Sequence, residues 1–154
     1  MRQRLQRCIS YLFFLGVLCV ISCTKQNTSM KTIIKTDSAP APIGPYSQAV
    51  LVDNTLFVSG QIAIDPATGN LVTINIIQET SQVMNNLLNI LTAAGMQFSD
   101  VVKTTIFLKD MNDFPHMNEV YEHFFEKDFP ARETVQVSGL PKGVNVEISV
   151  IAVR

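Results

Sequence analysis

The sequence predicts an α+β sandwich in which two helices cover one face of a mixed β-sheet. Three observations lead to this prediction. Along residues 30–154 β-rich and helical segments follow the order ββ(β)αβαββ, two segments repeat apolar residues at helical spacing, and the last strand is apolar on both faces. With 154 residues, of which 47% are apolar, the chain is long enough for one domain with its own core.

The first part of this order consists of strands. Met30–Lys35 is expected to form a short strand, and Ala39–Tyr46 is expected to be a loop because it holds three prolines and a glycine. Ala49–Val52 and Thr55–Ala63 are rich in β-forming residues and flank Asp53-Asn54, a two-residue hairpin signal.

Helices and strands then alternate. Apolar residues recur every 3.6 positions over Ile76–Ala94, and Gly95 suits the C-terminal cap of that helix. Val101–Leu108 is a β-branched strand, and Asp113 is expected to cap a second helix. The buried stripe of that helix is expected to be Val120, Tyr121, Phe124 and Phe125. The order ends with two strands, Glu133–Ser138 and Val144–Val153.

The last strand indicates more than one chain. Its alternate residues are apolar on one side, and the other side also carries Ile151 and Val153. Both faces of the sheet are therefore expected to be covered. Because two helices cover only one face, we expect the other face to meet a second subunit of a homo-oligomer.

Residues 1–29 are predicted to be a targeting segment and a short tether. Three arginines and no acidic residue precede Cys8–Ile21, a run too short to span a bilayer and typical of a secretory signal. Val20–Cys23 resembles the lipobox of bacterial lipoproteins, which implies lipidation of Cys23 and a membrane-anchored, exported protein. Met30 also resembles a natural start, and under that alternative residues 1–29 are an error of the gene model and the protein is cytosolic.

Without that segment the domain is acidic. Residues 30–154 hold 8 basic and 13 acidic residues, a net charge of −5, and no cysteine. A thiol nucleophile, a disulfide and a thiolate metal site are therefore excluded for this domain. The charge also disfavours a nucleic-acid partner.

Two residues of the domain suit the binding and hydrolysis of a small acid. Arg132 follows Phe129-Pro-Ala and is one of two arginines in the domain. Because a guanidinium is planar, an arginine at this position can hold a carboxylate by two hydrogen bonds. A surface ion pair is the commoner role of an arginine. Glu147 is the one acid of the last strand, where burial can raise its pKa and let it act on a water molecule. The alternative for Glu147 is an ion pair with Arg132 across an interface or a solvated edge position.

Other residue patterns are less specific. His116 and His123 lie seven residues apart, which does not match metal-ligand spacing, and we expect both to be solvated. Gly60 interrupts a β-rich run, which indicates either close approach of a ligand or a β-bulge. We expect no metal and no organic cofactor.

Several blocks in order resemble the RidA/YjgF family of reactive-intermediate (enamine/imine) deaminases, earlier labelled L-PSP endoribonucleases. The resemblance runs from Met30 to Arg154 and leaves out residues 1–29. The blocks are Ile43–Ala49, Phe57–Ile62, Val101–Thr105, Asn112–Phe114 with Asn118-Glu119, Phe129–Arg132, Leu140–Gly143 and Val146–Ile148.

The resemblance implies a chorismate-mutase-like subunit, a homotrimer, and pockets at the subunit interfaces. It implies that Arg132 clamps the carboxylate of the substrate and that Glu147 helps to position the attacking water. The residues that it implies for substrate binding are Tyr46, Ser59, Gly60, Phe114 and Thr134. Thr134 stands where many members have cysteine, which rules out a thiol mechanism. Glu133 stands where small residues are usual; strand alternation is expected to point it away from the pocket.

The implied reaction is hydrolysis of 2-iminobutanoate or 2-iminopropanoate to the 2-oxo acid and ammonia. Two other functions remain open at this point. One is a non-catalytic module that binds small carboxylates or protects other proteins. The other is a ribonuclease or translation inhibitor, which the acidic charge disfavours.

Overall fold

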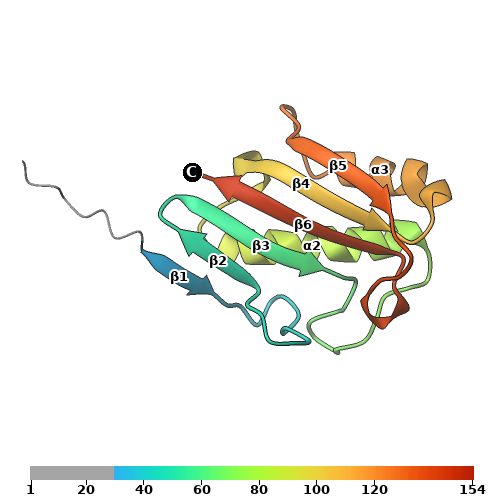
Figure 1. The fold of residues 1–154 in the computed structure, drawn as a ribbon, viewed down its shortest axis with the longest axis horizontal. Helices are drawn as coiled ribbons and strands as arrows, with labels where there is room; N and C mark the ends of the chain where they lie inside the picture. The colour runs from blue at the N-terminus through green and yellow to red at the C-terminus, as the bar shows by residue number, and fades with distance from the viewer. Residues whose placement is uncertain (1–29) are drawn as a thin grey trace, which may run out of the picture.

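Six strands form one mixed sheet in the computed structural model, which describes residues 30–154 (Figure 1). The sheet order is β1-β2-β3-β6-β4-β5, and only β4 and β5 run parallel to each other. This arrangement places the C-terminal strand in the interior of the sheet. The strands are β1 (Lys31–Ile34), β2 (Ala49–Val52), β3 (Thr55–Gln61), β4 (Val101–Leu108), β5 (Ala131–Gln136) and β6 (Val146–Val153).

Two helices, α2 (Ile76–Ala93) and α3 (Phe114–Glu122), lie on the same face of the sheet (Figure 1). The Asn75 side chain caps α2 by accepting a 2.9 Å hydrogen bond from the Gln78 amide. After α2, Gly95 takes the predicted left-handed conformation at φ +70°. Three short 3₁₀ turns complete the structure: Phe98–Asp100, Met111–Asp113 and Pro141–Gly143.

The core fills the space between the sheet and the helices. Alternate residues of β6 are buried there, and they pack with the apolar stripe of α2. Leu56, Leu87, Ile106 and Ile148 are fully buried members of this core. The Tyr121 hydroxyl donates a 3.1 Å hydrogen bond to Thr104, which ties α3 to β4.

The opposite face of the sheet is uncovered within residues 30–154. Cross-strand pairing aligns Ile33, Val50, Phe57 and Ile151 in one row across this face. Ile33 is 52% exposed and Phe57 is 47% exposed. An apolar row of this kind is typical of a surface that another protein covers. We call this side of the sheet the open face.

The predicted α+β class and all the predicted elements are confirmed, with small shifts at their ends. One local prediction was wrong: the Asp113 side chain makes no capping hydrogen bond to α3. Asp113 has helical backbone angles because the 3₁₀ turn before it runs directly into the helix. The capping bond lies three residues earlier, where Asp110 accepts from the Asn112 amide at 2.9 Å.

The predicted targeting segment, including Cys23, lies outside the described residues. Within residues 30–154, neither helix has the length and apolar character needed to cross a membrane.

Candidate functional site

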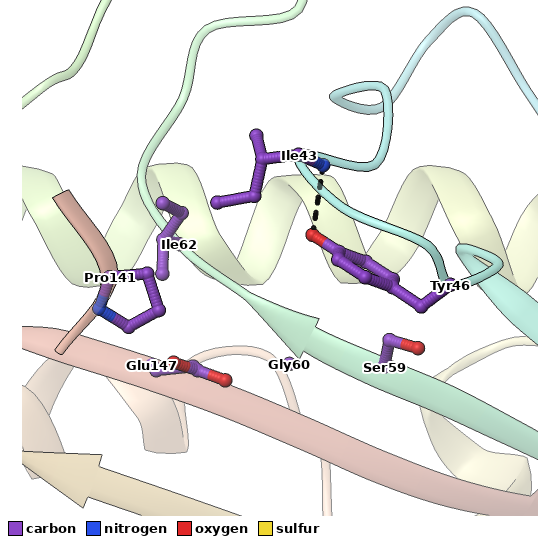
Figure 2. A pocket seen from close by; sticks show the side chains of 7 residues that line it. All are labelled: Ile43, Tyr46, Ser59, Gly60, Ile62, Pro141 and Glu147. Atoms are coloured by element: carbon purple, nitrogen blue, oxygen red, sulfur yellow. Dashed lines mark hydrogen bonds between the residues drawn. The ribbon is translucent and has the colours of Figure 1, made fainter.

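A cavity of about 360 Å³ lies where the Pro-rich loop meets β3 and β6 (Figure 2). Four residues predicted from the sequence, Tyr46, Ser59, Gly60 and Glu147, come together in its wall. The other lining residues are Ile43, Ile62 and Pro141. Figure 2 shows Ser59 and Glu147 on neighbouring strands, with the loop that carries Ile43 and Tyr46 beside them. We call this the carboxylate half-site.

Gly60 makes room for the Glu147 side chain. A methyl group added at Gly60 would lie 2.7 Å from Glu147 Cδ and 2.9 Å from Cγ, closer than real contacts allow. The pairing of β3 with β6 also shifts register between Val58 and Gln61, which marks a bulge at Gly60. The sequence suggested either a β-bulge or close approach of a ligand at Gly60. The structure shows the bulge, and the group that approaches Gly60 closely is the Glu147 side chain.

The Glu147 carboxylate is half-buried and unpaired. Among residues 30–154 no hydrogen bond or ion pair holds it, although the cavity leaves it accessible. Burial raises the pKa of Glu147 above its ordinary value. A carboxylate with a raised pKa and free acceptors can take a proton from a bound water molecule.

The loop over this cavity is fixed by internal hydrogen bonds. The Tyr46 hydroxyl accepts a 3.1 Å bond from the Ile43 amide (Figure 2), and Ser59 Oγ donates a 2.7 Å bond to the Ser47 carbonyl. The buried Gln48 amide donates to the carbonyls of the loop at 2.9–3.1 Å. These bonds give Tyr46 a defined position at the cavity.

A second cavity, of about 390 Å³, contains Arg132 and lies beside α3. Arg132 Nη1 donates a 2.8 Å hydrogen bond to Asn118 Oδ1. The guanidinium carbon lies 4.9 Å from the ring centre of Tyr121 and 5.6 Å from that of Phe114, both within cation–π range. Phe129 also lines the cavity. We call this the arginine half-site.

The Arg132 guanidinium is free to bind an anion. Among the described residues it forms no ion pair, so the surface-pair alternative does not apply to this chain. Burial raises the pKa of the neighbouring Tyr121 above its usual value, despite opposing effects of Thr104 and Arg132. Tyr121 is therefore neutral at physiological pH and leaves the arginine charge uncompensated.

Thr134 lies two residues after Arg132 on β5, and cross-strand pairing places both residues on the helix-covered side of the sheet. The Thr134 hydroxyl is buried and has no hydrogen-bond partner within residues 30–154. A buried hydroxyl normally has a partner. Thr134 is not among the residues that line either cavity.

The two half-sites lie on opposite sides of the sheet in one chain. Arg132 pairs with Thr104, which faces α3, whereas Glu147 pairs with Phe107, which has the alternate orientation. Successive residues of a strand point to opposite faces. The chain therefore does not bring Arg132 and Glu147 together.

Glu133 points to the opposite side of the sheet from Arg132 but to the same side as Glu147, so strand alternation removes it from the arginine half-site only. It lies on the open face, where it accepts hydrogen bonds from Lys103 and, at 2.6 Å, from Thr105. These bonds hold the pKa of Glu133 below its usual value.

His116 and His123 are exposed on and just after α3, as predicted. Within residues 30–154 no three His, Cys, Asp or Glu side chains gather in a way that could hold a metal ion.

Several residues that line or support the two cavities were not predicted from the sequence. Asn118 was noted only as part of a block, although it lies one helical turn after Phe114 and therefore on the same face of α3. Tyr121 was assigned to the core, yet its ring also supports the guanidinium. Ile62 and Pro141 were also noted only as parts of blocks, because their places in the wall depend on how loops meet in space.

Comparison with known proteins agrees with this geometry. A profile of the family described as Endoribonuclease L-PSP matches residues 36–154. A protein of Capra hircus named 2-iminobutanoate/2-iminopropanoate deaminase is 52% identical over 125 residues, which cover 81% of this chain and 91% of that protein. A crystal structure from Thermotoga maritima, titled an endoribonuclease, has a TM-score of 0.79 and 51% identity, covering 81% of this chain and 98% of that one. The structure of E. coli TdcF with bound serine has a TM-score of 0.77 and 42% identity, covering 80% and 98%.

Proposed function

The chain belongs to the Endoribonuclease L-PSP family, which is the RidA/YjgF family, and we propose that it hydrolyses reactive 2-imino acids. The substrates are 2-iminobutanoate and 2-iminopropanoate, and the products are the 2-oxo acid and ammonia. The observation that carries this proposal is an unpaired guanidinium in one half-site and an unpaired, half-buried carboxylate in the other.

The arginine half-site suits the carboxylate of a 2-imino acid. Arg132 has one hydrogen bond, to Asn118, and its remaining N–H groups can bind a carboxylate in a bidentate manner. The rings of Phe114 and Tyr121 keep the guanidinium in place. The serine in the TdcF structure is also a small carboxylic acid.

The carboxylate half-site suits the attack of water. Protonation of the imine gives an iminium ion, and Glu147 accepts a proton as the water oxygen bonds to the imine carbon. The resulting carbinolamine takes the proton from Glu147 on its nitrogen, and the carbon–nitrogen bond breaks. Ammonia leaves as the hydroxyl returns its proton to Glu147 and becomes the carbonyl of the 2-oxo acid. Positioning and electrostatics are sufficient for this step, because the iminium carbon is already electrophilic. This is a hydrolysis of a carbon–nitrogen bond.

We place the complete site between two copies of the chain. Both groups must lie within about 3 Å of one small substrate, which opposite sides of a single sheet do not allow. The apolar open face gives a second copy a surface on which to dock. An interface that joins the arginine half-site of one copy to the carboxylate half-site of the next is heterologous, and it forms a ring when its rotation closes. The trimer implied by the resemblance is such a ring.

Two observations disfavour the ribonuclease alternative. The domain has a net charge of −5, which repels a phosphate backbone. Its two histidines, His116 and His123, lie exposed outside both half-sites. The binding-module alternative makes use of Arg132 but gives no role to an accessible, unpaired Glu147.

Ammonia release from freshly generated 2-iminobutanoate tests the proposal. A pyridoxal-phosphate dehydratase acting on threonine supplies the substrate, and wild type is compared with Arg132→Ala and with Arg154→Ala as a control. Loss of a bidentate charged contact should lower kcat/KM of Arg132→Ala by about 10- to 100-fold, with Arg154→Ala close to wild type. Equal rates for wild type and Arg132→Ala would overturn the role of Arg132. A wild-type rate equal to buffer would favour the binding module.

A further inference from the structure

The buried side chain of Glu79 lies on the far side of the sheet from the Glu147 cavity. Glu79 is in the first turn of α2 and is fully buried. No ion pair compensates its charge among residues 30–154. A buried carboxylate without a cation is unfavourable unless hydrogen bonds satisfy it.

Three hydrogen bonds satisfy Glu79, and all come from the start of β6. Oε1 accepts from the Asn145 amide at 2.7 Å and from the Val146 amide at 3.4 Å, and Oε2 accepts from Asn145 Nδ2 at 2.9 Å. The Asn145 carbonyl also accepts a 2.9 Å bond from the Lys109 amide. The entry to β6 is therefore fixed on one side by α2 and on the other by the end of β4.

Glu147 is the next residue along the chain. Its own side chain has no hydrogen-bond partner among the described residues, and it lies across Gly60. The position of the carboxylate therefore depends on the backbone that precedes it. That backbone is the segment that Glu79 holds.

We propose that Glu79 is a positioning residue for the hydrolysis, because its carboxylate anchors Asn145 and Val146 and so fixes Glu147 over Gly60. The proposal rests on the function proposed above. It adds a residue that touches no substrate and that lies on the opposite side of the sheet from the group it positions.

Three variants separate this role from simple stabilisation. Glu79→Leu removes all three bonds, whereas Glu79→Gln keeps an acceptor for the backbone amides and can pair with a flipped Asn145 amide. Val83→Ala is the control: Val83 is fully buried one turn further along α2, so its truncation destabilises the same helix without a bond to β6.

Steady-state kinetics below the melting temperature of each variant measure the effect. We expect Glu79→Leu to lower kcat by about 10²-fold, since small displacements of a reacting group have effects of that size. KM should stay within about two-fold, because Glu147, the group that moves, lies on the opposite side of the sheet from the arginine half-site. Glu79→Gln should recover most of kcat, and Val83→Ala should keep it.

The acid limb of the pH profile gives a second readout. If Glu79→Leu frees the Glu147 carboxylate, the side chain becomes more solvated and the limb moves to lower pH. The proposal would be overturned if Glu79→Leu and Val83→Ala had the same kcat and the same pH for the acid limb. If Glu79→Leu does not fold, Asn145→Ala removes one of the three bonds with less disruption, and a wild-type kcat in that variant would overturn it. An inactive wild type would instead contradict the proposed function itself.

Discussion

The need for glycine at position 60 is explained by the side chain of Glu147. Gly60 does not have the positive φ that requires glycine. It is needed because the Glu147 side chain lies across it. The absence of a side chain at position 60 therefore decides where the carboxylate lies.

Substitution of Gly60 by alanine should separate activity from stability. The new methyl group would meet the flexible end of Glu147, so the carboxylate would move while the fold remains. We expect kcat to fall by about 10²-fold and the free energy of unfolding to change by less than about 1 kcal/mol. Gly139→Ala is the matched control, since nothing lies within 4 Å of a methyl group there. Kinetics and urea unfolding of both variants measure the two effects; unchanged kcat in Gly60→Ala would contradict this account.

The raised pKa of Glu147 predicts a pH dependence. Because burial raises this pKa above 4.5, Glu147 keeps its proton to a higher pH than an ordinary glutamate. The carboxylate form accepts the proton of water, so kcat/KM should fall as pH decreases through the raised pKa. The acid limb should therefore lie at a higher pH than an ordinary glutamate would give. Glu147→Gln should lose most activity, and any residual rate should lack this limb. A limb that persists in Glu147→Gln belongs to another group.

Sequence reasoning was strong for residues whose chemistry is local. We selected Arg132 and Glu147 because an internal arginine in an acidic domain and a single acidic residue in an apolar strand are both unusual. The partner of Arg132 was not predictable, since Asn118 becomes a ligand of the guanidinium only when α3 packs beside β5. The role of Gly60 was open for the same reason.

At the scale of elements, the loop between β1 and β2 depends on one side chain. Gln48 is 3% exposed, and its amide nitrogen donates to the carbonyls of Thr36, Ala39 and Pro40. Its amide oxygen accepts a 2.8 Å bond from the Thr36 amide. A loop with three prolines cannot satisfy its own backbone, so a buried side chain does so.

Gln48→Glu should therefore destabilise the protein although it hardly changes the shape of the side chain. Glutamate keeps the acceptor for Thr36 but loses every donor, which leaves buried carbonyls unsatisfied next to a buried charge. We expect a loss of about 1–3 kcal/mol in the free energy of unfolding, and displacement of Tyr46 with it. Gln78→Ala, at an exposed position of α2, should change it by less than about 0.5 kcal/mol. Urea unfolding measures both variants. Equal free energies of unfolding for Gln48→Glu and Gln78→Ala would contradict the role of Gln48.

The elements were predictable to within a few residues because their signals are periodic. The helix over Ile76–Ala93 and the strand over Val101–Leu108 follow directly from apolar spacing. The 3₁₀ turns were missed because three residues are too few to show a period. The capping bond predicted at Asp113 was wrong for the same reason, because the 3₁₀ turn before the helix was not predicted.

At the scale of the whole molecule, one chain carries two half-sites that face away from each other. The apolar character of both faces of the last strand predicted a partner from sequence alone, and the open face fits that expectation. The resemblance implied pockets at the subunit interfaces, but the sequence did not show that Arg132 and Glu147 lie on opposite sides of the sheet in one chain. That conclusion needs the register of β5 and β6 against β4.

Complementation between two inactive variants measures this claim most directly. Arg132→Ala and Glu147→Gln are each expected to keep at most about a tenth of the wild-type rate, because each removes one half of every site. If the proteins are unfolded together, mixed in equal amounts and reassembled, a random ring joins an intact arginine half-site to an intact carboxylate half-site at about one quarter of its interfaces. We predict recovery of about one quarter of the wild-type rate of ammonia release. A mixture that stays as inactive as its components, although native mass spectrometry shows mixed rings, would contradict a site shared between protomers.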